Sequence, residues 1–198
     1  MHGQMVRETT VRRGVLCACL VAGAMVVAEW RPMQASAKAE AARSTMKLVS
    51  PAFSEGQSIP AAYTCEGRDV SPPLKWSGVP SGTRSLALIC EDPDAPRGIW
   101  THWVYYGLSG SMMGLPEGVP TVENPPTGGK QGRNSFKHAG YGGPCPPAGR
   151  AHRYIFRIYA LDDNISLKPN AGREELVQAI HGHVIAEGEL MGTYQKKQ

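Results

Sequence analysis

RYIFRIYAL, residues 153–161, alternates between two sets of side chains along its whole length. The alternation places Tyr154, Phe156, Ile158 and Ala160 on one face. A period of two residues is typical of a β-strand, because successive side chains of a strand point to opposite sides. The stretch therefore predicts a strand over Arg153–Leu161.

Several other apolar segments of the chain are also short, and residues that favour turns separate them. Ser71-Pro72-Pro73 and the stretch from Glu123 to Gly129 are examples of such turn-rich sequence. No fixed-period repeat is present, and no linker divides the chain after residue 45. The further predicted strands are residues 46–49, 85–90, 103–106 and 184–194.

One segment near the C-terminus is typical of a helix. Asn170 can cap it, two glutamates lie in its first turn, and Gly182 can close it. Leu176, Val177 and Ile180 are expected to share its apolar face. A single helix among many strands and loops favours a mainly β domain with antiparallel pairing.

The first 37 residues have the features of an export signal. A basic start precedes an apolar run from Val15 to Ala28, and Ala35-Ser36-Ala37 matches the pattern that precedes signal-peptidase cleavage. The run is shorter than the roughly 20 residues that span a bilayer, so no transmembrane segment is expected in the mature chain. We predict a signal peptide over 1–37, a flexible segment over 38–45 and one domain over 46–198. The mature protein is then periplasmic or secreted, by either the Sec or the twin-arginine route.

The charge of the chain argues against a nucleic-acid partner. Removal of residues 1–37 would take away four arginines and two glutamates, so the formal net charge would fall from +4 to +2. Nucleic-acid-binding proteins are recognised by a concentrated basic patch, whereas the basic residues here are scattered among acidic ones. No binding of nucleic acid is therefore expected.

Cleavage would also reduce five cysteines to three. Cys90 follows an apolar run and is predicted to be a buried strand residue. Cys65 and Cys145 lie in loops flanked by glycine, which makes them the better candidates for a disulfide in an oxidising compartment. Sequence separation does not show whether these two residues approach each other. No cysteine pair has the spacing of metal ligands, and no metal or cofactor is expected.

Three short stretches contain most of the side chains that could form a binding site. They are DPDAP (92–96), WTHW (100–103) and GGPCPP (142–147) running on to HRY (152–154). Taken singly, an Asp-Pro turn or a histidine in an aromatic strand is more often structural than functional. Together they favour a small anion-binding pocket, because protonated imidazole, tyrosine hydroxyl and loop amides all donate hydrogen bonds.

An aspartate in such a pocket has two interpretations. It can orient a neighbouring histidine and raise the pKa of that histidine. Alternatively, Asp92 or Asp94 can receive the ammonium group of a zwitterionic ligand, with Trp100 offering an aromatic face to the same cation. The residues leave both interpretations open.

These stretches resemble the phosphatidylethanolamine-binding protein family, and most closely its bacterial Raf-kinase-inhibitor-like branch. The resemblance extends over essentially the whole mature chain and includes YTCEG (63–67), SPPL (71–74) and HVIAEGELMGTY (183–194). It implies a large central antiparallel sheet with a smaller flanking sheet, few helices, and a pocket for phosphate-like groups such as phosphorylethanolamine. The residues that it places in this pocket are Asp92, Asp94, Trp100, His102, Cys145, Pro146, Pro147, His152 and Tyr154.

Three functions are compatible with these features. We prefer a binding protein for a small anionic or zwitterionic ligand, such as a phospholipid head group. The first alternative is a protein-interaction module that inhibits a kinase or a protease through residues 115–138. The second is a hydrolase in which Asp92 and His102 act as base and orienter. No Gly-x-Ser-x-Gly elbow, metal-ligand cluster or P-loop supports catalysis, so no enzyme activity is expected. The oligomeric state, including a homodimer, stays open.

Overall fold

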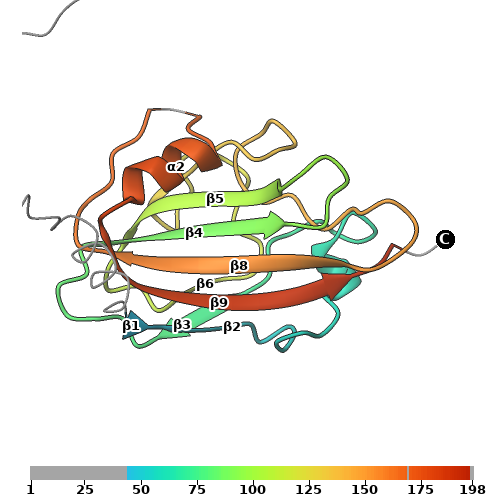
Figure 1. Ribbon diagram of the computed structural model, residues 1–198, viewed down its shortest axis with the longest axis horizontal. Helices are drawn as coiled ribbons and strands as arrows, with labels where there is room; N and C mark the ends of the chain where they lie inside the picture. The colour runs from blue at the N-terminus through green and yellow to red at the C-terminus, as the bar shows by residue number, and fades with distance from the viewer. Residues whose placement is uncertain (1–43, 169, 197–198) are drawn as a thin grey trace, which may run out of the picture.

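The computed structural model describes residues 44–168 and 170–196, which form a mainly β fold with two sheets (Figure 1). The larger sheet has six strands in the order β1-β9-β8-β4-β5-β7, and its neighbouring strands are antiparallel except for β1 and β9. The smaller sheet has three antiparallel strands in the order β2-β3-β6. The predicted large antiparallel sheet with a smaller flanking sheet is confirmed.

The larger sheet consists of β1 (Ser44–Thr45), β9 (Val184–Tyr194), β8 (His152–Leu161), β4 (Ser85–Asp92), β5 (Trp100–Ser109) and β7 (Lys130–Gln131). The smaller sheet consists of β2 (Lys47–Val49), β3 (Leu74–Ser77) and β6 (Gly114–Leu115). The described residues also include a 3₁₀ turn, η1 (Ala61–Tyr63), and an α-helix, α2 (Arg173–Ile180). None of their helices has the length and apolar character that crossing a bilayer requires.

The main hydrophobic core lies between the two sheets. The four side chains that the alternation places on one face of β8, Tyr154, Phe156, Ile158 and Ala160, are all fully buried in this core. Trp76 of β3 enters the same core from the smaller sheet. Burying a side chain as large as phenylalanine is worth about 1.5–3 kcal/mol, so this contact between the sheets contributes strongly to stability.

Helix α2 covers the other face of the larger sheet beside β5 (Figure 1). Strand β4 lies between β5 and β8 and is buried along its whole length, because the core covers one face and the region of α2 covers the other. Burial on both faces explains why residues 86–90 form a continuous apolar run. Cys90 belongs to this run; it is buried and has a free thiol, as predicted.

The start of α2 differs from the prediction. Its N-cap is Gly172, whose backbone N–H donates to the Glu175 carboxylate over 3.0 Å. Asn170 lies two residues earlier with φ of +60°, in the left-handed region. Asparagine caps a helix only where its own backbone is extended, so the expected Asn170 cap is wrong.

The apolar face and the end of α2 are partly as predicted. Leu176 and Ile180 are buried, whereas Val177 is 39% exposed. Val177 follows Leu176 by one residue and is therefore rotated about 100° around the helix axis, away from the sheet. Gly182 has φ of +84°, which is the left-handed conformation expected just after a helix.

The bounds of β5 and the N-terminal segment also differ from the prediction. Strand β5 begins at Trp100, three residues before the predicted start, so its first residues reach the end of the sheet near Asp92. Ser44–Thr45, expected to be part of a flexible segment, form β1 and pair with β9. The predicted signal peptide over 1–37 lies outside the described residues.

Candidate functional site

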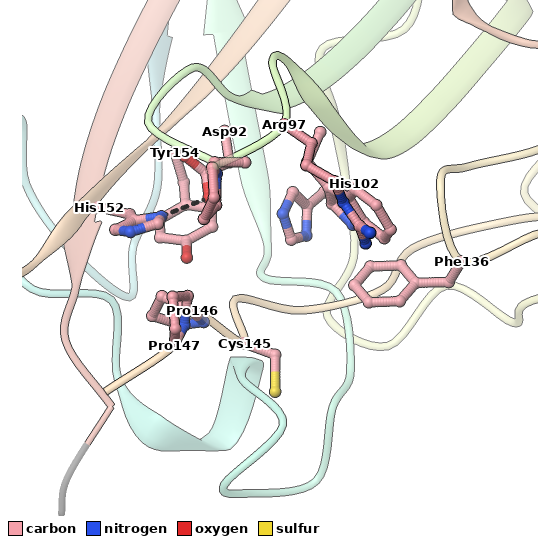
Figure 2. A pocket seen from close by; sticks show the side chains of 12 residues that line it. Asp92, Arg97, His102, Phe136, Cys145, Pro146, Pro147, His152 and Tyr154 are labelled. Carbon is pink, nitrogen blue, oxygen red and sulfur yellow. Dashed lines mark hydrogen bonds and ion pairs between the residues drawn. The ribbon is translucent and has the colours of Figure 1, made fainter. Parts of the chain in front are cut away.

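A pocket of about 430 Å³ lies at the end of the larger sheet (Figure 2). Strand β4 runs antiparallel to both β5 and β8, so its last residue, Asp92, meets the first residues of both neighbours. Asp92 pairs directly with Trp100 in the sheet register. This topology brings three sequence stretches together, and the pocket is lined by Asp92, Ala95, Pro96, Arg97, Trp100, His102, Phe136, Cys145, Pro146, Pro147, His152 and Tyr154.

All the predicted site residues except Asp94 line this pocket. Asp94 instead accepts hydrogen bonds from Arg153: from its Nε over 2.9 Å, from its guanidinium NH2 over 2.9 Å and from its backbone N–H over 3.0 Å. The Arg153 guanidinium holds the pKa of Asp94 well below its usual range. Asp94, which the sequence analysis placed in the pocket, is therefore not among the lining residues, and it instead attaches the 92–97 loop to β8.

Asp92 and His152 form a buried pair at the inner end of the pocket (Figure 2). The Nδ1 atom of His152 donates to Oδ2 of Asp92 over 2.8 Å, and each residue is only 4% exposed. The other carboxylate oxygen, Oδ1, accepts the backbone N–H of Asp94 over 2.8 Å. Because Nδ1 is occupied, Nε2 is the nitrogen that His152 can offer to a ligand. The hydrolase hypothesis paired Asp92 with His102, but the hydrogen-bonded partner is His152.

His102 lies in the middle of the pocket wall and has a different environment. Its Nδ1 atom donates to the Gly142 carbonyl oxygen over 2.6 Å, and its ring makes edge-on contacts with Phe136 and Tyr154. Burial lowers the pKa of His102 below its ordinary value, although the Gly142 carbonyl and the charge of Asp92 oppose this shift. His102 is therefore a neutral imidazole at pH 7, and not the protonated donor that the sequence suggested.

Tyr154 supplies a hydrogen-bond donor that has no partner. Its side chain is fully buried, and its hydroxyl makes no hydrogen bond with any described residue. In Figure 2 this hydroxyl is directed toward Pro146 and Pro147. Burial raises the pKa of Tyr154, so the hydroxyl keeps its proton at physiological pH. A buried hydroxyl without a partner is costly, and a bound ligand would remove that cost.

The loop that carries Cys145 and the two prolines is fixed in several places. Cys65 and Cys145, the better disulfide candidates in the sequence, do form a disulfide, with their Cα atoms 5.4 Å apart. The backbone N–H of Cys65 donates to the Pro144 carbonyl, and that of Gly143 donates to Asp69. A Cβ at Gly143 would lie 2.4 Å from the Tyr63 carbonyl oxygen, so only glycine fits there.

The outer part of the pocket has an aromatic wall, of which the sequence predicted Trp100 but not Phe136. Phe136 contacts Trp100 with ring centroids 5.4 Å apart in an edge-on arrangement. Its loop is attached to β5 because Ser135 and Thr101 exchange two hydrogen bonds of 2.9 Å. Arg97 lies exposed at the mouth and has no ion pair with any described residue. Phe136 comes from a distant loop with no local signal, whereas Arg97 directly follows the predicted 92–96 stretch.

The pocket offers hydrogen-bond donors, one buried carboxylate and aromatic surface. Tyr154 can donate from the inner wall, His152 can meet a ligand through Nε2, and Arg97 supplies positive charge at the mouth. This combination suits an anionic group attached to a small organic part. Among residues 44–168 and 170–196, no three His, Cys, Asp or Glu side chains are grouped as metal ligands.

Comparison with known proteins agrees with the fold. The family model "Phosphatidylethanolamine-binding protein" matches residues 49–195. A UPF0098 protein of Methanothermobacter thermautotrophicus is 48% identical over 151 residues, which are 76% of this chain and 99% of that protein. A UPF0098 protein of Chlamydia trachomatis is 45% identical over 156 residues, which are 76% of this chain and 99% of that protein.

Solved structures give the same result. The crystal structure of the phosphatidylethanolamine-binding protein homolog CT736 from Chlamydia trachomatis has a TM-score of 0.71 and 44% sequence identity, over 77% of this chain and 99% of that one. E. coli YbcL, described as a new member of the mammalian family, has a TM-score of 0.73 and 34% identity, over 78% of this chain and all of that one. This chain therefore belongs to the phosphatidylethanolamine-binding protein family.

Proposed function

We propose that this protein binds a small anionic or zwitterionic ligand with a phosphate-like group, such as phosphorylethanolamine, in the pocket at the end of the larger sheet. The observation that carries the proposal is the unpartnered hydroxyl of Tyr154 beside the buried Asp92–His152 pair. Both groups belong to the strands of the larger sheet and lie in the lining of the pocket. Preorganised donors of this kind lower the cost of binding.

The size and lining of the pocket support a ligand larger than a bare ion. A volume of about 430 Å³ is typical of small-molecule sites. The aromatic wall of Trp100 and Phe136 provides a surface for the organic part of the ligand or for its ammonium group. The buried Asp92 carboxylate adds negative charge that favours a zwitterion over a simple anion.

The proposed function includes export of the protein from the cytoplasm and a binding role without enzyme activity. Residues 1–37 support export to the periplasm or the medium, where the ligand would be met. Asp92 holds His152 by a hydrogen bond, which supports a binding role in which the carboxylate orients the imidazole. No serine, threonine or reduced cysteine is among the residues that line the pocket, so a nucleophile of those three types has no support there.

Calorimetric titration with phosphorylethanolamine tests this proposal. The His152→Ala variant should bind more weakly by about 1.5–3 kcal/mol, the range for a hydrogen bond to a charged group. The matched control is His181→Ala, which removes an exposed histidine at the end of α2 and should leave affinity unchanged. If His152→Ala binds as tightly as the parent, the pocket is not the ligand site, and if the parent does not bind phosphorylethanolamine, the proposed function is wrong.

A further inference from the structure

The hydrogen-bonding state of His102 restricts the kind of anion that the pocket can accept. The ring is 2% exposed and is held between Phe136 and Tyr154, with centroid distances of 5.4 and 5.1 Å. Its Nδ1 atom lies 2.6 Å from the Gly142 carbonyl oxygen. A carbonyl oxygen only accepts, so the proton of the neutral ring is on Nδ1. Nε2, the other nitrogen of this pocket-lining ring, then carries a lone pair and accepts a hydrogen bond.

The charged groups around His102 do not reverse this assignment. Asp92 and Asp69, together with the carbonyls of Gly142 and Gly143, favour a protonated ring, but burial outweighs them and lowers the pKa of His102. Asp92 is also engaged by the hydrogen bond from His152. Tyr154, which contacts the ring, stays neutral because burial raises its pKa.

The inner wall therefore presents an acceptor next to a donor. Nε2 of His102 accepts, whereas the Tyr154 hydroxyl has a proton to donate and no partner. The two rings are neighbours, with their centroids 5.1 Å apart, so a tetrahedral anion can meet both groups at once. An anion whose oxygens are all unprotonated would bring a lone pair against the lone pair of Nε2. An anion with one acidic O–H would satisfy both groups.

We propose that the pocket selects the singly protonated form of a phosphate monoester, whose P–OH donates to Nε2 of His102 while another oxygen accepts from Tyr154. This inference rests on the proposed function and narrows it from phosphate-like groups to monoesters. A sulfate ester has no acidic proton near neutral pH, and a phosphodiester has none either. Sulfate esters and phosphodiesters are therefore expected to be poor ligands. Because the head group of an intact phospholipid is a phosphodiester, the pocket would bind the free head-group monoester in preference to the phospholipid.

The test compares three molecules that share the ethanolamine part. Phosphorylethanolamine is the monoester, 2-aminoethyl sulfate is its sulfate counterpart, and glycerophosphoethanolamine is the diester. At pH 7.0, where His102 is neutral, roughly a tenth of a phosphate monoester with a second pKa near 6 carries the acidic proton, and affinity is expressed per protonated molecule. Phosphorylethanolamine should bind on the order of tenfold to a hundredfold more tightly than either other molecule, since each leaves Nε2 without a donor.

The outcomes separate this inference from the proposed function. Equal affinity for phosphorylethanolamine and 2-aminoethyl sulfate would overturn the inference and leave the proposed function intact. Tighter binding of glycerophosphoethanolamine would also overturn it and favour a lipid source. Binding of none of the three would overturn both. In the His102→Gln variant the preference for the monoester should fall below about threefold, whereas His181→Gln should keep it.

A measurement on the unmodified protein covers the case in which His102→Gln does not fold. Nitrogen-15 NMR of the imidazole groups reports which ring nitrogen carries the proton. At pH 7 the free protein should show His102 with a proton on Nδ1 and an unprotonated Nε2, and a contact between that proton and the Gly142 region distinguishes His102 from His152. A proton on Nε2 of His102 at that pH would overturn the inference.

Discussion

Replacing Asp92 with alanine should destabilise the fold far more than replacing Asp94, although Asp94 makes more hydrogen bonds. Asp92 is 4% exposed and accepts hydrogen bonds from His152 over 2.8 Å and from the Asp94 amide over 2.8 Å. The hydrogen bond between His152 and the carboxylate contributes about 1.5–3 kcal/mol, and the hydrogen bond from the backbone N–H of Asp94 about 0.5–1.5 kcal/mol. The free energy of unfolding should therefore fall by about 2–4.5 kcal/mol in Asp92→Ala.

Asp94→Ala is the matched control for burial. Asp94 accepts three hydrogen bonds from Arg153, but the Arg153 side chain is 54% exposed, so solvent screens the pair and the loss should be much smaller. Urea unfolding followed by tryptophan fluorescence measures both variants. With a slope of about 2 kcal/mol per molar urea, the midpoint of Asp92→Ala should fall by roughly 1–2 M. Equal midpoints for the two variants would refute the reasoning that burial decides the magnitude.

Three further results are expected. Replacing Cys65 and Cys145 together by serine should lower the free energy of unfolding by about 2–5 kcal/mol, because the disulfide closes a long loop with a sequence separation of 80; an unchanged urea midpoint would contradict this. Glu91→Ala should lower the free energy of unfolding by about 3 kcal/mol, because this buried carboxylate forms ion pairs with one arginine of β8 and one of α2. Thermal unfolding measures the loss, and a loss below about 1 kcal/mol would show that solvent screens the ion pairs. The pKa of His102 is lowered in the folded protein, so the unfolded chain binds more protons at low pH. The free energy of unfolding should therefore decrease as pH falls below about 6.5. Urea midpoints measured between pH 8 and pH 5 should decrease less in His102→Gln than in the parent, and an equal decrease would contradict this.

The sheet and its core could be predicted from the sequence because strand periodicity is a local property. The alternation along residues 153–161 determines which side chains of β8 are buried, whatever strand lies next to it. The continuous apolar run before Asp92 likewise indicates a strand covered on both faces. The helix cap was missed because Gly172 and Asn170 are both plausible caps, and only the backbone angles distinguish them.

The grouping of the site residues could be predicted, but not their partners. Strand β4 lies between β5 and β8, so Asp92 has a histidine-bearing strand on each side. The strand order and register, which local sequence patterns do not show, place Asp92 within hydrogen-bond distance of His152. His102 bonds instead to the carbonyl oxygen of Gly142. Asp94 lies beyond the end of β4, where no strand periodicity constrains the side chain, and there Arg153 binds it.

The aromatic wall illustrates the limit of local reasoning. Phe136 is an isolated aromatic residue in a loop of polar and basic residues. It reaches the pocket because the neighbouring Ser135 binds Thr101 of β5, a contact across 34 positions of the chain. Gly142 leaves the space that the Phe136 ring occupies, since a Cβ there would lie 2.6 Å from it. Such contacts depend on the assembled fold and have no signature in either segment alone.

The central claim is that the pocket between the ends of β4, β5 and β8 binds a phosphate group. A crystal structure of the protein soaked with phosphorylethanolamine tests this claim most directly. We predict tetrahedral density within hydrogen-bond distance of the Tyr154 hydroxyl and of Nε2 of His152, with the ethanolamine part toward Trp100. A saturated crystal with the ligand bound elsewhere, or with the Tyr154 hydroxyl still unpartnered, would contradict the account.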